Sequence, residues 1–382
     1  MMTANSEAAA PAAAVELPGF VMSAEEAERA AAAAGVGTVE DLLPLLVPSA
    51  MRLARPPISR FPVGAVGLGE SGRVYVGVNL EFLGVPLSQV VHAEQFLITN
   101  AAAAGERALR AIAVSHMPCG HCRQFLQEIR GAAGIRILVT SDADDGCAPE
   151  WRALASLLPR PFGPHDLLPK DAPLVLEPHD NPLGDPVDAV ANGFAGGDLE
   201  ARLREAAEAA ARAAHAPYSG CPAGFAVADG EGKVYAGGSL ESAAYNPTLG
   251  PVQTAIIAMV AGGGGPAGDV VAAALVEKDG SVTAQEATAR IFLAGVAPQA
   301  TFHVYKYRSS DSTAQAAWAY DVENVHLLVS TYDELNFHKF DSDMPDLDPV
   351  PRRMVSACET QKDREAGELL ETEQAGIYMV EI

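Results

Sequence analysis

The sequence predicts an α/β protein built from two tandem copies of one layered unit. In the first half of the chain, β-rich segments alternate with segments of helical periodicity, which is typical of helices packed against a mixed sheet. The second half repeats the first, because a shift of 160 positions aligns ten identical residues without a gap, from Pro57 on Pro217 to Glu81 on Glu241. This repeat indicates that one domain has been duplicated.

The chain begins with an Ala-rich extension, residues 1–36. Within it, Ser23 followed by two glutamates predicts one short capped helix. Apolar residues recur at helical spacing from Val39 to Ala54 and predict a second helix. The Pro-Pro pair at 56–57 ends that helix, because the residue before a proline is driven out of the helical region.

The remaining elements of the first domain follow in order. A glycine-containing turn at residues 69–72 joins two β-rich runs into a hairpin, and these runs are Val63–Leu68 and Arg73–Val78. Periodicity and length then predict two helices and two strands, at His92–Ala104 (helix), Ala111–Ser115 (strand), Cys119–Ile129 (helix) and Ile135–Thr140 (strand). We expect this first domain to span residues 37–170.

A second domain follows a linker. The segment 171–197 is rich in Pro, Asp, Asn and Gly, so we expect it to cross the surface. A helix at Leu199–Ala214 then opens the second domain, residues 198–309. Residues 310–382 form an acidic extension that contains one candidate strand, Val325–Val329, and no motif that indicates a function.

The second copy lacks the chemical groups that distinguish the first. With a one-residue deletion, Pro251 and Gln253 align with His92 and Glu94. Neither proline nor glutamine supplies the imidazole or the carboxylate of the first copy. We therefore expect a second domain without a metal site.

Composition and charge restrict the class of protein. With 49% hydrophobic and 20% charged residues, the chain lies in the range of globular proteins. A formal net charge of -23 repels phosphate backbones, so we expect no nucleic-acid partner. The chain has no long apolar run and no secretory or transit signal, so we expect no membrane association and a cytosolic location.

Five cysteines in 382 residues do not make a disulfide framework. Cys147 is expected to be a free thiol. Cys221 and Cys358, the sulfurs nearest the second copy, belong to no Cys-x-x-Cys pair.

The strongest chemical signal is a pair of motifs, H-A-E at residues 92–94 and P-C-G-H-C at residues 118–122. His92, Cys119 and Cys122 supply one imidazole and two thiolates, which are zinc ligands. Three protein ligands leave the fourth tetrahedral position open for water, as in catalytic zinc sites. Both motifs lie at predicted helix starts, where the helix dipole favours thiolates.

Glu94 is the expected proton carrier. Zinc lowers the pKa of a bound water, and a carboxylate must then relay the proton to the substrate nitrogen and the leaving group. Two residues from His92, Glu94 can face that water without becoming a ligand.

A Cys-x-x-Cys pair alone is also common in structural zinc sites and redox motifs, so the upstream H-A-E is needed for the catalytic interpretation. His121 lies inside the second motif and is expected to pack locally. Other histidines, among them His116, His165 and His215, are expected at the surface or in packing positions.

Longer runs around these motifs carry a family resemblance. Four of them resemble the cytidine deaminases of nucleoside salvage in their two-domain homodimeric form: F-P-V-G-A from Phe61, G-V-N-L-E-F from Gly77, H-A-E-Q from His92 and P-C-G-H-C-R-Q-F-L-Q-E-I from Pro118. Two others resemble the degenerate second domain of that form, above all in plant members: A-H-A-P-Y-S-G from Ala214 and E-S-A-A-Y-N-P-T-L-G-P from Glu241. The resemblance spans Val39 to Tyr307.

The resemblance implies a cytidine deaminase-like α/β/α layered fold with a mixed sheet, present as two tandem copies, and one Zn2+ per chain in the first domain. It implies a set of substrate contacts: Asn79 and Glu81 on the ribose hydroxyls, Phe61 near the base, and backbone groups around Ala93 and Cys119 on the pyrimidine. An amide and a carboxylate together can donate to and accept from a sugar hydroxyl. The alternatives are a strand-end turn role for Asn79 and a core role for Phe61.

The implied reaction is hydrolytic deamination of free cytidine and deoxycytidine in pyrimidine salvage. Tyr245 of the second copy would reach a partner subunit's site in the homodimer. Val91 replaces the threonine usual before the histidine, and the tail after Ser310 replaces the usual chain end. Three rivals stay open: a deaminase acting on RNA or DNA, a zinc-stabilised interaction module without activity, and a chain inactivated by its tail.

Overall fold

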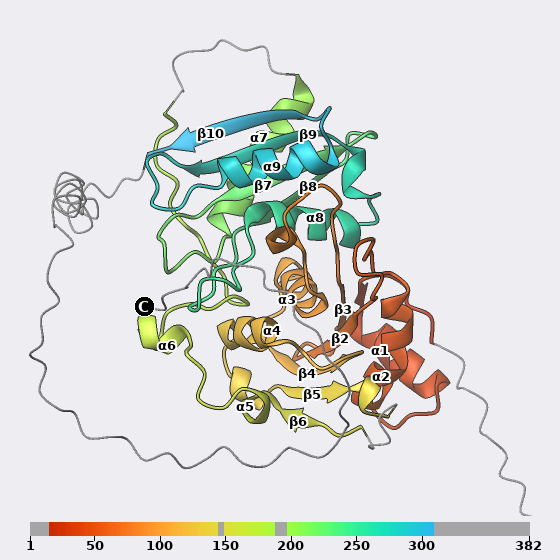
Figure 1. The fold of residues 1–382 in the computed structure, drawn as a ribbon. Helices are drawn as coiled ribbons and strands as arrows, with labels where there is room; N and C mark the ends of the chain where they lie inside the picture. Colours follow the sequence, from red (N-terminus) through yellow and green to blue (C-terminus); the bar gives the residue numbers. More distant parts are fainter. Residues whose placement is uncertain (1–14, 144–148, 188–196, 309–382) are drawn as a thin grey trace, which may run out of the picture. The chain divides into compact units, whose positions relative to one another are not determined.

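The computed structural model describes residues 15–143, 149–187 and 197–308. These residues form two sheets, one in each half of the chain, with helices packed on them (Figure 1). The strand expected at Val325–Val329 and Cys147 lie outside the described residues. Among the helices described, none combines the length and the apolar character needed to cross a bilayer.

The first sheet is mixed and has the strand order β1-β3-β2-β4-β5-β6. Its strands are β1 Val21–Met22, β2 Gly64–Gly69, β3 Val74–Val78, β4 Leu109–Val114, β5 Arg136–Val139 and β6 Arg152–Ala153. The predicted hairpin is present as antiparallel β2 and β3, and Gly72 in its turn has φ +82, which glycine adopts without strain. β4 and β5 are parallel, so the α4 segment crosses over between them.

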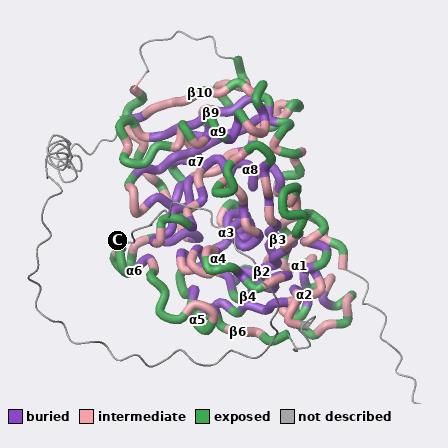
Figure 2. The backbone as a smooth tube through the Cα atoms, in the orientation of Figure 1, coloured by how far each residue is buried: buried purple, intermediate pink, exposed green. Residues whose placement is uncertain are grey.

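Helices cover both faces of this sheet. The helices of the first half are α1 Ala24–Ala33, α2 Val39–Met51, α3 Ala93–Ala103, α4 Gly120–Phe125, α5 Leu154–Leu157 and α6 Pro164–Leu167. An added Cβ at Gly64 would meet α2, and one at Gly77 would meet α3. Every residue of β2 and β3 is buried, as the purple tube in Figure 2 shows.

Side-chain caps mark the starts of α1, α2 and α4. Ser23 caps α1, as predicted, and does so through a capping box: its hydroxyl accepts from the Glu26 amide, and its own amide donates to the Glu26 carboxylate. His92 and Cys119 are the N-cap residues of α3 and α4. The helix expected to run to Ile129 is instead α4 followed by one 3₁₀ turn. Short 3₁₀ turns complete this half: η1 Leu87–Gln89, η2 Leu126–Glu128, η3 Ala132–Gly134 and η4 Thr140–Ala143.

The second half repeats the layout of the first. Its elements are α7 Asp198–Arg212, β7 Gly224–Asp229, β8 Val234–Gly238, α8 Pro251–Ala261, η5 Ala267–Asp269, β9 Val270–Lys278, α9 Glu286–Val296 and β10 Thr301–Tyr307. The sheet order β10-β9-β7-β8 matches the order β5-β4-β2-β3, and β9 and β10 are parallel as β4 and β5 are. The duplicated α/β fold predicted from the sequence is therefore confirmed.

The alignment of the two helix starts is different from the one predicted. In each half an antiparallel bridge holds the residue before the helix: Leu80 pairs with Val91, and Leu240 pairs with Leu249. Gly250 is then the N-cap of α8, where His92 is the N-cap of α3.

The second copy is thus two residues shorter between the bridge partners, not one. Gly250 corresponds to His92 and Val252 to Glu94, so the pairing of Pro251 and Gln253 with those two residues was wrong. Gln253 instead corresponds to Gln95.

Part of the expected surface linker belongs to the core. Leu174, Val175 and Leu176 are only 2%, 3% and 5% exposed, and the Val175 amide donates to the Glu128 carbonyl at 3.0 Å. Three consecutive apolar side chains bury area against the core, which outweighs the turn-forming composition around them.

A buried carboxyl group connects the two halves. Glu128 has no exposed surface and accepts hydrogen bonds from the Tyr218 hydroxyl at 2.6 Å and the Ala243 amide at 2.8 Å. His215 Nε2 lies 3.4 Å from the same carboxyl group. Burial, followed by the hydrogen bond to Glu128, raises the pKa of Tyr218. One side chain of the first half thereby satisfies three polar groups of the second.

We expect Glu128→Ala to lower the free energy of unfolding by about 3 kcal/mol or more, since each buried donor left without an acceptor costs about 1–3 kcal/mol. Urea unfolding followed by circular dichroism measures this, with Tyr218→Phe expected to have a smaller effect. Glu208→Ala, which breaks the partly exposed Arg204–Glu208 pair, is the control, with an expected loss below about 0.5 kcal/mol. Equal losses for Glu128→Ala and Glu208→Ala would contradict the anchoring role.

Candidate active site and metal centre

The structure brings the three predicted ligands together at two helix starts. His92 and Cys119 occupy the N-caps of α3 and α4, and Cys122 lies in the first turn of α4. His92 Nδ1 is 3.5 Å from Cys119 Sγ and 3.4 Å from Cys122 Sγ. The ligand atoms all lie within 4.8 Å of one another, and across the described ranges no other group of three or more metal-ligating side chains meets this criterion.

These distances fit a zinc ion. With Zn–S near 2.3 Å and Zn–N near 2.05 Å, the tetrahedral angle puts a ligand nitrogen and a ligand sulfur about 3.6 Å apart. The observed separations of 3.4 and 3.5 Å are close to that value. One imidazole with two thiolates is also the donor set of a zinc site with one open position.

The electrostatics of the three groups favour a thiolate. The hydrogen bond from Cys122, with further help from His92, lowers the pKa of Cys119 to about 3. The bond to Cys119 in turn raises the pKa of His92, and the bond to Cys119 together with burial raises the pKa of Cys122. The backbone amide of Cys122 also points at Cys119 Sγ, 3.5 Å away, as expected at a helix N-terminus.

Glu94 lies beside this trio without belonging to it. Its side chain is 4% exposed, and Cys122 Sγ is 3.2 Å from its Oε2. Burial raises the pKa of Glu94, which favours the protonated form. A buried carboxyl group at this distance from a ligand atom is in a position to exchange protons with a group bound next to the trio.

Gln95 is the neighbour that the sequence analysis missed. It is 1% exposed, and its Oε1 accepts from the His92 amide at 3.2 Å. Its Nε2 donates to the Pro247 carbonyl at 3.0 Å and is 3.0 Å from His121 Nε2. The available signal was its place three residues after the N-cap, where Glu or Gln completes a capping box. His121 packs locally, with its ring 5.3 Å from that of His92.

Asn79 and Glu81 hold the loop that carries Phe61. Asn79 Oδ1 accepts from the Val63 amide at 2.8 Å, and its Nδ2 donates to the Phe61 carbonyl at 3.0 Å. Glu81 Oε2 accepts from two backbone amides of the same loop, those of Ile58 and Ser59, both at 2.8 Å. Both side chains therefore position residues 58–63.

Phe61 is half exposed, at 49%, and is not a core residue. Its ring lies 4.5 Å from that of His116, centroid to centroid. Ala93 is buried at the start of α3, and Val91 is buried in its bridge with Leu80.

The second half preserves the carboxylate anchor. Glu241 Oε2 accepts from the Tyr218 and Ser219 amides at 3.0 and 3.1 Å, as Glu81 does in the first half. Asn79 has become Ser239. The anchor is thus also present in the half whose described residues include no metal-ligating trio.

Tyr245 lies on a loop that borders the site of its own chain. Its side chain is 66% exposed and its φ is +60. Two residues later, the carbonyl of Pro247 accepts the bond from Gln95. This places the loop next to the helix start that carries His92.

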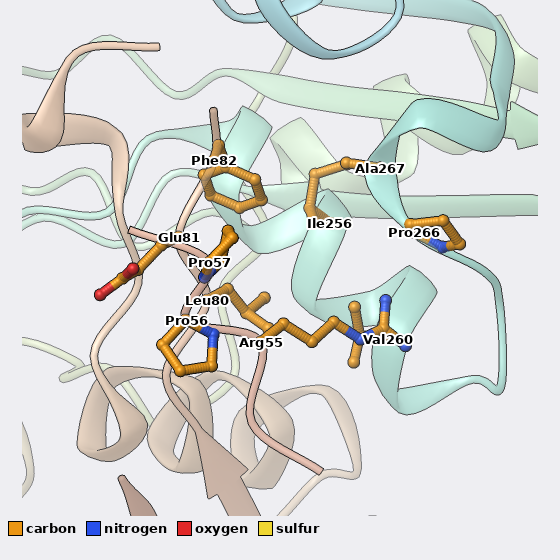
Figure 3. A pocket seen from close by; sticks show the side chains of 10 residues that line it. All are labelled: Arg55, Pro56, Pro57, Leu80, Glu81, Phe82, Ile256, Val260, Pro266 and Ala267. Atoms are coloured by element: carbon orange, nitrogen blue, oxygen red, sulfur yellow. The ribbon is translucent and has the colours of Figure 1, made fainter. Parts of the chain in front are cut away.

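A cavity of about 420 Å³ lies next to the 58–63 loop, and its lining does not include the trio. Its lining is mostly apolar and comes from both halves: Arg55, Pro56, Pro57, Leu80, Glu81, Phe82, Ile256, Val260, Pro266 and Ala267. In Figure 3 the carboxylate of Glu81 points away from Ile256 and Ala267, and the Arg55 side chain extends toward Val260. Arg55 donates to the Gly265 carbonyl at 2.9 Å.

Two regions of the chain match known protein-family models. Residues 40–137 and residues 154–290 each match a family model described as the cytidine and deoxycytidylate deaminase zinc-binding region. A solved cytidine deaminase from Mycobacterium tuberculosis is 32% identical and covers 32% of this chain and 97% of its own, with a TM-score of 0.28.

Full-length relatives are more informative. Cytidine deaminase 1 of Arabidopsis thaliana is 50% identical over 299 residues, which are 76% of this chain and 98% of the relative. Cytidine deaminase 6 of the same plant is 46% identical, covering 72% of this chain and 96% of the relative. The chain belongs to the cytidine deaminase family of zinc-dependent hydrolytic deaminases.

Proposed function

We propose that the chain deaminates free cytidine and deoxycytidine by hydrolysis, giving uridine and deoxyuridine plus ammonia, and serves pyrimidine salvage. The observation that carries the proposal is the buried carboxyl group of Glu94, 3.2 Å from a sulfur of the His92, Cys119 and Cys122 trio. A proton carrier next to an open metal site is what the hydrolysis of an aromatic amine needs.

One Zn2+ per chain would be held by His92, Cys119 and Cys122. When bound, zinc acts as a Lewis acid that makes hydroxide available near neutral pH. In the second half, Gly250 and Val252 stand where His92 and Glu94 do, so that half has neither the imidazole nor the carboxyl group. We therefore assign zinc to the first domain alone.

Glu94 would carry the protons of the reaction. As water adds to carbon 4 of the pyrimidine, Oε2 would take one proton from the water and pass it to ring nitrogen 3. Oε2 would then take the remaining proton from the new hydroxyl group on carbon 4 and deliver it to the amino group. As the carbonyl forms at carbon 4, the bond from carbon 4 to the amino nitrogen breaks and ammonia leaves. The raised pKa of Glu94, caused by burial, suits a group that must both hold and release a proton.

The sugar would be recognised by the loop that Asn79 and Glu81 already position. Their amide and carboxylate groups are suited to ribose hydroxyls, with Phe61 near the base. A carboxylate also repels a phosphate, which favours a nucleoside over a nucleotide. Backbone groups around Ala93 would hold the pyrimidine, and Tyr245 would contribute from its exposed loop.

The domain organisation follows the same proposal. Residues 37–170 form the catalytic domain, and residues 198–309 form a scaffold domain that builds a homodimer. The chain would act on a small molecule in the cytosol, and its net charge of -23 disfavours a nucleic-acid partner.

Replacing Glu94 by Gln should lower kcat for cytidine by about 10²–10⁴-fold, because the proton relay is removed while the shape is kept. Ultraviolet absorbance follows the conversion to uridine, and metal analysis checks that about one zinc per chain remains. Near-normal turnover in this variant would contradict the assigned role.

Cys119→Ser and Cys122→Ser should each abolish tight zinc binding, because a hydroxyl is a poor replacement for a thiolate. Zinc per chain after dialysis is the measurement. Cys221→Ser is the matched control, since this cysteine is buried in the second half and should leave zinc content unchanged. Tight zinc binding by both the Cys119→Ser and the Cys122→Ser variants would contradict the proposed zinc site.

Glu81→Gln should raise KM for cytidine about 10-fold or more, because a hydrogen bond to a charged group contributes about 1.5–3 kcal/mol. The matched control is Glu241→Gln, which alters the same backbone anchor in the second half. Both variants should unfold at similar urea concentrations, and only Glu81→Gln should change KM. Equal kinetics in the two would limit Glu81 to positioning its loop.

A further inference from the structure

Two buried glutamines, at equivalent positions in the two halves, each form a hydrogen bond to the opposite half. Gln95 in α3 and Gln253 in α8 each lie three residues after the helix N-cap, and they are 1% and 5% exposed. Gln95 Nε2 donates to the Pro247 carbonyl at 3.0 Å, and Gln253 Nε2 donates to Gln89 Oε1 at 3.0 Å. Both acceptors lie three residues before the N-cap of the opposite half, so the contacts are symmetric.

The two amides differ at their other ends. Gln95 Oε1 accepts from the His92 amide at 3.2 Å, and Gln95 Nε2 is 3.0 Å from His121 Nε2. Gln253 Oε1 is buried and has no hydrogen-bond partner within the described part of the chain. Only the first-half glutamine therefore connects the opposite half to a metal-ligating residue.

The hydrogen bonds of Gln95 use both N–H groups of its amide and one lone pair of its amide oxygen. An amide nitrogen carries two hydrogens, which here point to Pro247 and to His121, and the oxygen accepts from His92. Three partners on three segments fix the side chain in one orientation. Gln95 thus joins three groups: the backbone of His92, the ring of His121 and the 243–249 loop of the second half.

We propose that Gln95 is a positioning residue through which the second half, by its 243–249 loop, holds His92 in the orientation that zinc binding needs. This rests on the proposed metal site. It gives the second domain a role at the site although that domain lacks ligands. Groups that orient a metal ligand without touching the metal typically change metal affinity 10–100-fold when replaced.

The first test is zinc affinity, measured on the full chain by competition with a chromogenic chelator. Gln95→Met keeps the length of the side chain and removes all three bonds, and should weaken zinc binding about 10–100-fold. Gln253→Met, the matched control, removes the symmetric contact and should leave zinc affinity within about two-fold. Equal losses in the two variants, or no loss in Gln95→Met, would overturn the proposal.

The second test needs no substitution. Coupling between two sites is reciprocal, so zinc bound at His92 should also steady the loop that Gln95 contacts. Hydrogen exchange of the Tyr245 and Thr248 amides, which are bonded within that loop, should slow when zinc is added to metal-depleted protein. In Gln95→Met this slowing should disappear. Identical exchange with and without zinc in the unaltered chain would overturn the proposal.

These readouts are independent of turnover. Zinc binding with the expected Gln95 dependence but no deamination of cytidine would refute the proposed function and leave the positioning role intact. If a Gln95→Met variant deaminates cytidine and binds zinc with unchanged affinity, the positioning role is refuted and the proposed function stands.

Discussion

The close approach of α3 to β3 at Gly77 is the constraint on which the site depends. An added Cβ at this glycine would overlap the Ala93 carbonyl and the Leu97 amide. Any side chain there would push away the first turns of the helix, which carry His92 and Glu94. The three candidate ligands meet beside a strand position that has no side chain.

The duplicated half shows which features serve the fold and which serve chemistry. Gly237 keeps the same close contact with α8, and Glu241 keeps the same carboxylate anchor as Glu81. The imidazole and the carboxyl group of the H-A-E motif are replaced by Gly250 and Val252. The packing contacts are therefore present in both halves, whereas the imidazole and the carboxyl group are present at these positions in the first half alone.

Local signals in the sequence were sufficient for most elements and for the ligand trio. Capping at Ser23, hairpin glycines, apolar periodicity and the spacing of Cys119 and Cys122 all act within a few residues, so they can be recognised along the chain. The register of α8 could not be predicted in this way, since it depends on the bridge between Leu240 and Leu249. Burial of Leu174–Leu176 likewise depends on what packs above it.

Contacts between the halves were beyond sequence reasoning for the same reason. Gln95 and Pro247 are 152 positions apart, and Glu128 and Ala243 are 115 positions apart. The neighbouring sequence does not distinguish a buried glutamine that bonds to the other half from a glutamine at the surface. Only the capping-box position of Gln95 offered a partial signal.

Hydrogen bonding separates the two buried carboxyl groups next to the site. Glu128 accepts from a hydroxyl and a backbone amide and lies 3.4 Å from an imidazole, so its oxygens are committed to the fold. Glu94 is equally enclosed, yet the side chain it contacts is the thiol of Cys122. A carboxyl group buried with so few donors is destabilised as an anion, and its pKa rises. In the proposed reaction this cost to stability is tolerated because Glu94 would take up and release a proton. Burial alone does not distinguish Glu94 from Glu128, whereas their hydrogen-bond partners do.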